Sequence, residues 1–287
     1  MRERGKNRPM KSILAIAWVN YESWVWSPRT VLMPVFIAAI CYLQMCGYES
    51  ILQSTGFGMH YIETMFYEFS FGCNMPMTTA LFLIMVSELP RRMIFQQYIL
   101  IRSHRWHWLA AQILYCLMMV LTMLAVIFLF MTTFALPLVT PGEGWSDMER
   151  IAAGVIEPEM TLIDLSIIHQ FSPAAALIAA MIPVFCFWFT MVLVILLFGI
   201  WGHAVIGLMI YASLMVAHVT IYFECFPFPV RLPMHYATLM NIMSISGQEL
   251  EQLCSVIGGY VVIIVALIAI MMASVKYVEL DLYMKAR

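Results

Sequence analysis

HWLAAQILYCLMMVLTMLAVIFLFMTTFALPL, residues 107–138, is an apolar run without a single Asp, Glu, Lys or Arg. A helix of about 20 predominantly apolar residues is long enough to cross the hydrocarbon core of a bilayer. The whole chain has the same character, because 63% of its 287 residues are hydrophobic and only 11% are charged. Soluble domains carry about 25% charged residues. We therefore expect an all-α integral membrane protein.

Further apolar runs lie on both sides of residues 107–138. Together they predict six transmembrane helices, over residues of about 31–47, 71–87, 107–138, 174–198, 201–223 and 255–275. The fourth and fifth are joined only by a tight turn at residues 199–203. The expected organisation has two parts: residues 1–30 form a basic tail and an interfacial helix, and residues 31–287 form the six-span domain.

The placement of the basic residues predicts which side of the membrane each loop faces. Cytoplasmic loops of membrane proteins are enriched in Lys and Arg. With a cytoplasmic N-terminus and six spans, all of the 15 basic residues except Arg150 and Arg231 lie on the inner side. Both termini are therefore expected in the cytoplasm, in a multi-pass protein of the plasma (inner) membrane.

Residues 12–26, SILAIAWVNYESWVW, precede the first span and have the pattern of an amphipathic helix. Most apolar residues fall on one helical face, whereas Asn20 falls elsewhere. A break at Ser27-Pro28 separates this helix from the first span, although an extension of that span is the alternative. Aromatic residues anchor such helices at a membrane surface, and those expected to do so here are Trp18, Tyr21 and Trp24.

Two segments on the outer side are expected to carry structure of their own. The spacing of Ile62, Met65, Phe66 and Phe69 matches one face of a short amphipathic helix before the second span. The segment before the sixth span, residues 224–246, is apolar but interrupted by several prolines. Irregular backbone at membrane depth must be shielded by protein or line a cavity, so a re-entrant or extracellular hairpin is expected there.

Motifs for nucleotide hydrolysis and for metalloprotease chemistry are absent from the sequence. It contains no G-x-x-x-x-G-K-[ST] and no H-E-x-x-H, so we expect no catalytic residue, metal site or cofactor in this chain. Ion-driven carriers often use ionisable residues inside the membrane, and none of the six runs contains Asp, Glu, Lys or Arg. His218 and Asn74 are the remaining polar candidates, and His218 is expected to be a hydrogen-bonded packing residue.

The seven cysteines have no C-x-x-C and no zinc-binding spacing. Most of them lie within the predicted spans, where cysteine behaves as a small hydrophobic residue. Cys225 and Cys254 can both lie on the outer side, and the sequence leaves open whether they pair.

The stretch SELPRRMIFQQYILIRSHRW, residues 87–106, joins the second and third spans on the cytoplasmic side. It holds four arginines, more than the orientation of so short a loop requires, although topology alone is the simplest explanation. A short helix after Pro90 would present apolar side chains to a groove and pair its arginines with acids of a partner or with lipid phosphate. The residues expected to form this docking element are Glu88, Arg91, Arg92, Phe95, Tyr98, Arg102 and Arg105.

The layout of the whole chain resembles the membrane subunits of ABC-2-type transporters. The similarity includes an interfacial helix before the first span, six spans with both termini inside, a cytoplasmic helix between the second and third spans and an interrupted hairpin before the sixth. The nearest local similarity runs from Glu88 through Arg91 and Arg92 to Arg102 and Trp108, where that family places an acid followed by a basic coupling helix. The Gly-Thr that often follows the first arginine in that family is missing here.

This resemblance implies the permease subunit of an ABC exporter. Two such subunits, identical or related, would pair, and each would dock a separate ATPase subunit that binds ATP and Mg. The implied cargo is hydrophobic or amphipathic, such as a peptide, a lipid or a drug, and no nucleic-acid partner is expected. Two alternatives stay open: an ion-coupled carrier or channel without an ATPase, and a membrane scaffold or sensor that recruits a cytosolic partner through residues 87–106.

Overall fold

The computed structural model describes residues 8–55, 58–70, 74–90, 105–140, 142, 144–146, 165–222, 232–243 and 249–275. Over these residues the chain is helical, and its only extended pairing is an isolated parallel bridge between Met59 and Val139. The helices in chain order are α1 (Arg8–Val25), α2 (Pro28–Thr55), α3 (Tyr61–Ser70), α4 (Asn74–Val86), α6 (Arg105–Ala135), α8 (Leu165–Gln170), α9 (Pro173–Ile200), α10 (Ala204–Tyr222), η2 (Pro233–Ala237), α11 (Leu239–Met243) and α12 (Glu249–Ser274).

Four helices in the described part of the chain are long and apolar enough to cross a membrane, namely α2, α6, α9 and α12. The helices α4 and α10 are apolar as well but shorter. The described part of the chain is therefore all-α, as expected, and its helices are consistent with a helical membrane protein.

The helices agree with the predicted spans in position but not always in length. The bounds of α6 and α9 lie within a few residues of the prediction, whereas α2 continues to Thr55 and α12 already begins at Glu249. Hydropathy marks only the apolar part of a helix, while backbone hydrogen bonds continue through the polar turns beyond it. The predicted break before α2 and the short helix before the second span are both present, the latter as α3.

The central helix of the bundle is α9, which packs against α3, α6, α10 and α12. Its most apolar window is 72% buried, compared with 11% for the corresponding window of α12. A helix that is apolar on every side is suited to such a position. Ser172 caps its first turn, with Oγ accepting a hydrogen bond from Ala175 N at 3.4 Å. It ends in the predicted tight turn, where Gly202 has a φ of 83°, a conformation that favours glycine.

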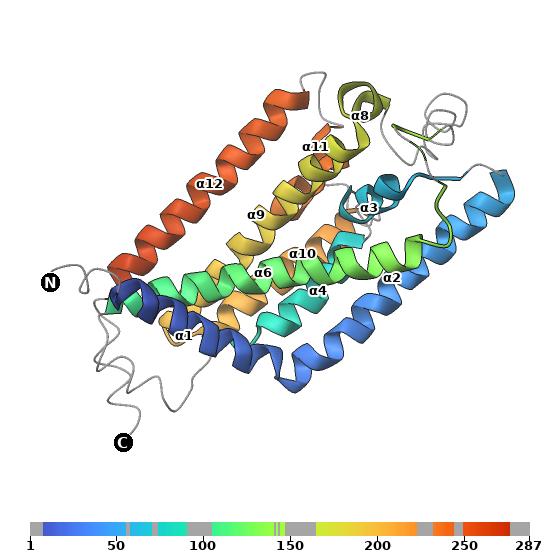
Figure 1. The fold of residues 1–287 in the computed structure, drawn as a ribbon. Coiled ribbons are helices and arrows are strands. Elements are labelled where there is room, and N and C mark those ends of the chain that lie inside the picture. Colours follow the sequence, from blue (N-terminus) through green and yellow to red (C-terminus); the bar gives the residue numbers. More distant parts are fainter. Residues whose placement is uncertain are drawn as a thin grey trace, which may run out of the picture.

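Figure 1 shows how the helices are arranged around α9. The start of α1, the end of α4, the start of α6, the turn between α9 and α10 and the end of α12 all lie at one end of the bundle, and α1 crosses this end. The helices α3, α8 and α11 lie at the opposite end. We call these the α1 end and the α3 end.

Trp188 joins α9 to α4 in the middle of the bundle. Its indole is fully buried, its Nε1 donates a hydrogen bond to Thr79 Oγ1 at 3.0 Å, and its ring centroid lies 5.2 Å from that of Phe82. The substitution Trp188→Phe keeps most of the packing but removes the donor. We expect it to lower the free energy of unfolding by about 1–2 kcal/mol, measured by denaturation of the detergent-solubilised protein. The control Trp201→Phe, at a half-exposed site, is expected to change it by less than about 0.5 kcal/mol, and an equal effect of the two would contradict this role.

Candidate functional site

At the α1 end, α1 lies along α6 and is hydrogen-bonded to both α4 and α6. Trp24 is 1% exposed, and its Nε1 donates a hydrogen bond to the carbonyl of Met85 on α4 at 3.1 Å. The hydroxyl of Tyr21 lies 2.7 Å from Thr122 Oγ1 on α6 and shares a hydrogen bond with it. The aromatic residues of α1 therefore hold it against the bundle as well as giving it an apolar surface. Of the three predicted anchors, Trp18 alone is largely exposed.

One prediction for α1 was wrong. Asn20 was expected to lie off the apolar face of α1, but it is buried together with Ala17 and Trp24. These three residues are spaced by three and four, so they share one face of α1. Trp18, expected on the apolar face as a membrane anchor, is 57% exposed.

The end of α4 is joined to the start of α2 by a polar contact. Arg29 Nη1 donates a hydrogen bond to Ser87 Oγ at 2.7 Å and lies 3.6 Å from Glu88 Oε1. Both side chains of the ion pair are partly exposed, so its contribution to stability is about 0–1 kcal/mol. Its effect is on orientation, because it fixes the first residues of the stretch 87–106 against α2.

The two residues after Glu88 pack against other parts of the bundle, and Pro90 lies against α9. Leu89 is buried, and Pro90 lies so close to Gly199 that a Cβ atom on Gly199 would be 3.0 Å from the backbone nitrogen of Pro90. Only glycine allows this approach of two backbones. The start of the stretch 87–106 is thus held by α2 and α9, and we call this arrangement the α1-end junction.

The predicted docking residues fall into two groups. Glu88 belongs to the α1-end junction through its ion pair with Arg29, and Arg105 is the first residue of α6. The end of α4 and the start of α6, on either side of residues 91–104, both lie at the α1 end. The remaining residues lie outside the described part of the chain, namely Arg91, Arg92, Phe95, Tyr98 and Arg102.

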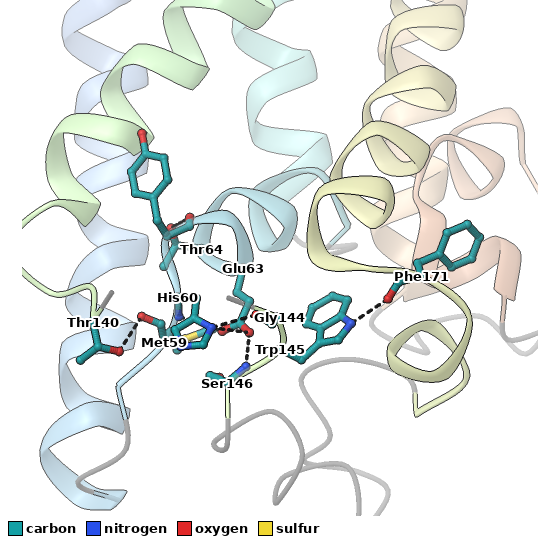
Figure 2. A network of polar contacts seen from close by, with 10 residues as sticks. Met59, His60, Glu63, Thr64, Thr140, Gly144, Trp145, Ser146 and Phe171 are labelled. Atoms are coloured by element: carbon teal, nitrogen blue, oxygen red, sulfur yellow. Dashed lines mark hydrogen bonds and ion pairs between the residues drawn. The ribbon is translucent and has the colours of Figure 1, made fainter. Parts of the chain in front are cut away.

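At the α3 end, a fully buried carboxylate organises the backbone. Glu63 Oε2 accepts a hydrogen bond from His60 N at 2.9 Å, which caps the first turn of α3, and Oε1 accepts one from Ser146 N. The His60 ring bonds the carbonyl of Gly144 at 2.8 Å through Nδ1, which lies 3.9 Å from Glu63 Oε1. Figure 2 shows these groups converging on Glu63.

Two further bonds complete this network, which we call the Glu63 network (Figure 2). Thr140 N donates to the carbonyl of Met59 at 3.1 Å, and Trp145 Nε1 donates to the carbonyl of Phe171 at 2.8 Å. The Glu63 network therefore ties the start of α3 to the segment after α6 and to the segment before α9. Sequence reasoning missed it, because it identified only the apolar face of α3.

A second acid of α3, Glu68, is also buried. Burial raises the pKa of the Glu68 carboxyl from 4.5 to about 8, and the interaction with the Gln44 side chain of α2 opposes part of this rise. Sequence reasoning missed Glu68 because it lies just before the second predicted span. Two acids in the otherwise apolar stretch 61–70 were the signal that could have revealed both.

The other residues raised by the sequence have less distinctive surroundings. His218 is buried in α10, and its ring centroid lies 6.5 Å from that of His235 in η2. Cys254 is an exposed free thiol, and Cys225 lies outside the described residues. A cavity of about 260 Å³ adjoins the α1-end junction, and its almost entirely apolar lining is formed by Tyr21, Val25, Trp26, Thr30, Val31, Pro34, Ile37, Met85, Thr122, Met123 and Val126.

The described chain thus has a candidate site at each end of the bundle. The α1-end junction braces the stretch 87–106, and the α3 end holds the two buried acids Glu63 and Glu68. Comparison with known proteins finds no matching family model, no matching curated protein and no matching solved structure.

Proposed function

We propose that the chain is the membrane-spanning permease subunit of an ABC-2-type exporter. It would move a hydrophobic or amphipathic cargo, such as a peptide, a lipid or a drug, and a separate subunit would bind and hydrolyse ATP. The observation that carries this proposal is the α1-end junction, in which the start of the stretch 87–106 is bonded to α2 and packed against α9.

The α1-end junction is suited to the transmission of force. A force applied to residues 91–104 would reach Pro90 and then Gly199, at the end of the most buried of the four membrane-length helices described. It would also reach α2 through Glu88 and Arg29. Packed helices respond to such a displacement by shifting between discrete arrangements rather than by continuous deformation. Motion of a bound ATPase subunit would in this way rearrange the spans.

The proposal includes the full topology. The shorter helices α4 and α10 would complete a set of six spans, with α1 at the cytoplasmic surface and both termini in the cytoplasm of a plasma-membrane protein. In support, α1 begins and α12 ends at the same end of the bundle. Two copies, or one copy and a related permease, would enclose the path of the cargo.

Co-purification with candidate ATPase subunits tests this function. Replacing Arg91, Arg92 and Phe95 together by alanine removes two charges and an aromatic ring from the stretch that would dock the ATPase. We expect retention of the ATPase to fall at least about tenfold, since charged and aromatic residues dominate binding at most interfaces. The matched control replaces Arg150 and Arg231, on the predicted outer side, and should retain the ATPase. Equal retention by both variants would overturn the proposed docking role.

Glu68 favours a second candidate function, that of a proton-coupled carrier without an ATPase. Buried ionisable residues in membrane proteins commonly mark proton pathways, and Glu68 is such a residue at the α3 end. Cargo flux into vesicles driven by an imposed proton gradient in the absence of ATP, and lost on Glu68→Gln, would favour the carrier over the ABC permease.

A further inference from the structure

Three polar atoms near one another at the α3 end lack hydrogen-bond partners of ordinary geometry within the described chain. They are Glu68 Oε2 on α3 and the two amide atoms of Gln44 on α2, Nε2 and Oε1. Gln44 is also the side chain that interacts with the Glu68 carboxyl. Buried polar groups in native proteins are nearly always hydrogen-bonded, so this cluster needs a chemical explanation.

The protonation state of Glu68 supplies one. An ionised carboxylate can only accept hydrogen bonds, so it could pair with Gln44 Nε2 but would leave Gln44 Oε1 without a donor. A neutral carboxylic acid has one O–H donor and one acceptor oxygen. It can donate to Gln44 Oε1 while accepting from Gln44 Nε2. A single proton on Glu68 therefore satisfies all three atoms together.

Glu63 lies on the same short helix as Glu68 but has hydrogen-bond donors for both of its carboxylate oxygens. Both of its oxygens accept hydrogen bonds from backbone N–H groups, those of His60 and Ser146. Two buried acids five residues apart thus differ in their surroundings, because both oxygens of Glu63 have backbone donors and Glu68 Oε2 has none in the described chain.

We propose that Glu68 and Gln44 form a proton-binding site in which the carboxylic acid and the amide exchange two hydrogen bonds. On release, the O–H bond of Glu68 breaks, its electron pair stays on the carboxylate, and the proton passes to water at the α3 end. This site is independent of any ATPase partner, so its test and that of the proposed function can fail separately.

Within the described residues, the helices packed around Glu68 carry few charged groups. Cys41 of α2 is the titratable group that faces it. The other helices packed on α3 are α4, α6, α9 and α11, and α4, α9 and α11 contain no charged residue, while the basic residues of α6 lie in its first turn. Burial among apolar helices therefore determines the charge of Glu68 and keeps its pKa at about 8, above neutral pH.

Infrared spectroscopy of the full-length protein in phosphatidylcholine vesicles tests the site directly. We expect the C=O stretching band of a protonated carboxylic acid at neutral pH, which disappears as the pH is raised through about 8 and is absent from Glu68→Gln. Gln44→Leu should shift this band to higher frequency, because it removes the hydrogen-bond partner. The exposed control Glu251→Gln should leave it unchanged. The absence of any band at neutral pH that depends on Glu68 would overturn the proposal.

The pH dependence of stability is an independent readout. A carboxyl whose pKa is higher in the folded state adds stability that is complete below the unfolded value of 4.5 and is lost as the pH rises toward about 8. The melting temperature of the wild-type protein should therefore fall over this range. Glu68→Gln is expected to fold, since an amide can exchange the same two hydrogen bonds with Gln44, and to remove this part of the fall. Identical pH profiles of the two proteins would contradict proton binding at Glu68.

Discussion

Replacing Gly199 by valine is expected to uncouple the stretch 87–106 from the bundle. The new Cβ would lie 3.0 Å from the backbone nitrogen of Pro90 and 3.1 Å from the carbonyl oxygen of Leu89. Backbone atoms cannot move aside as a flexible side chain can, so either Pro90 leaves α9 or α9 shifts. Overpacking of this kind costs about 1–3 kcal/mol or more. We expect a lower melting temperature and, in the proposed complex with an ATPase subunit, loss of cargo-stimulated ATP hydrolysis.

The control for this variant is Gly259→Val on α12, where a Cβ would meet nothing within 4 Å. Both substitutions place a β-branched residue in a helix, so the difference between them isolates the contact with Pro90. A Gly199→Val protein as stable and active as the control would show that the approach of Pro90 to α9 is not needed. If the Gly199→Val protein is stable and still binds the ATPase, but ATP hydrolysis no longer responds to cargo, the variant has lost only the coupling between the stretch 87–106 and the spans.

Replacing Glu63 by alanine is expected to produce the largest loss of stability at the α3 end. The Glu63 side chain is fully buried, and its removal leaves the N–H groups of His60 and Ser146 without their acceptor. Each buried donor left unpaired costs about 1–3 kcal/mol, and the capping of α3 is lost as well. We expect the free energy of unfolding to fall by about 3–5 kcal/mol, measured by denaturant titration in detergent micelles.

Glu251→Ala on α12 serves as the matched control, because the side chain of Glu251 is exposed. It should change the free energy of unfolding by less than about 0.5 kcal/mol. Limited proteolysis adds a local readout, since loss of the Glu63 network should increase cleavage after α6, near Trp145. Equal stability of Glu63→Ala and Glu251→Ala would show that the bonds of the Glu63 network contribute nothing.

Much of the helical framework follows from the sequence, because hydropathy is a local property. The apolar stretches predicted α6 and α9 to within a few residues, and Gly199 to His203 predicted the turn after α9. The break at Ser27-Pro28 separated α1 from α2 for a similarly local reason, since the residue before proline is disfavoured in a helix. The candidate docking residue Glu88 is also visible in the sequence, as an acid at the end of an apolar run.

The candidate sites themselves were harder to predict. The partners of Glu63 include Ser146, and the partner of Glu88 is Arg29, in both cases dozens of residues away along the chain. No short window of sequence contains both members of either pair. The sequence showed that Glu63 and Glu68 are acids in an apolar stretch, but not that folding buries them both.

The sequence by itself thus determined the class of the protein and the positions of its main helices, because length and apolar composition decide whether a helix can lie in a bilayer. Only the tertiary structure decided which polar side chains are buried and which groups they contact. Gly199 contacts Pro90 only because the fold places the end of α9 beside the residues that follow α4. Glu68 is a candidate proton site only because the fold packs α3 among apolar helices and places Gln44 beside this acid. The physical reason is that the cost of a charge depends on the solvent and partners around it, which the fold assembles from distant segments.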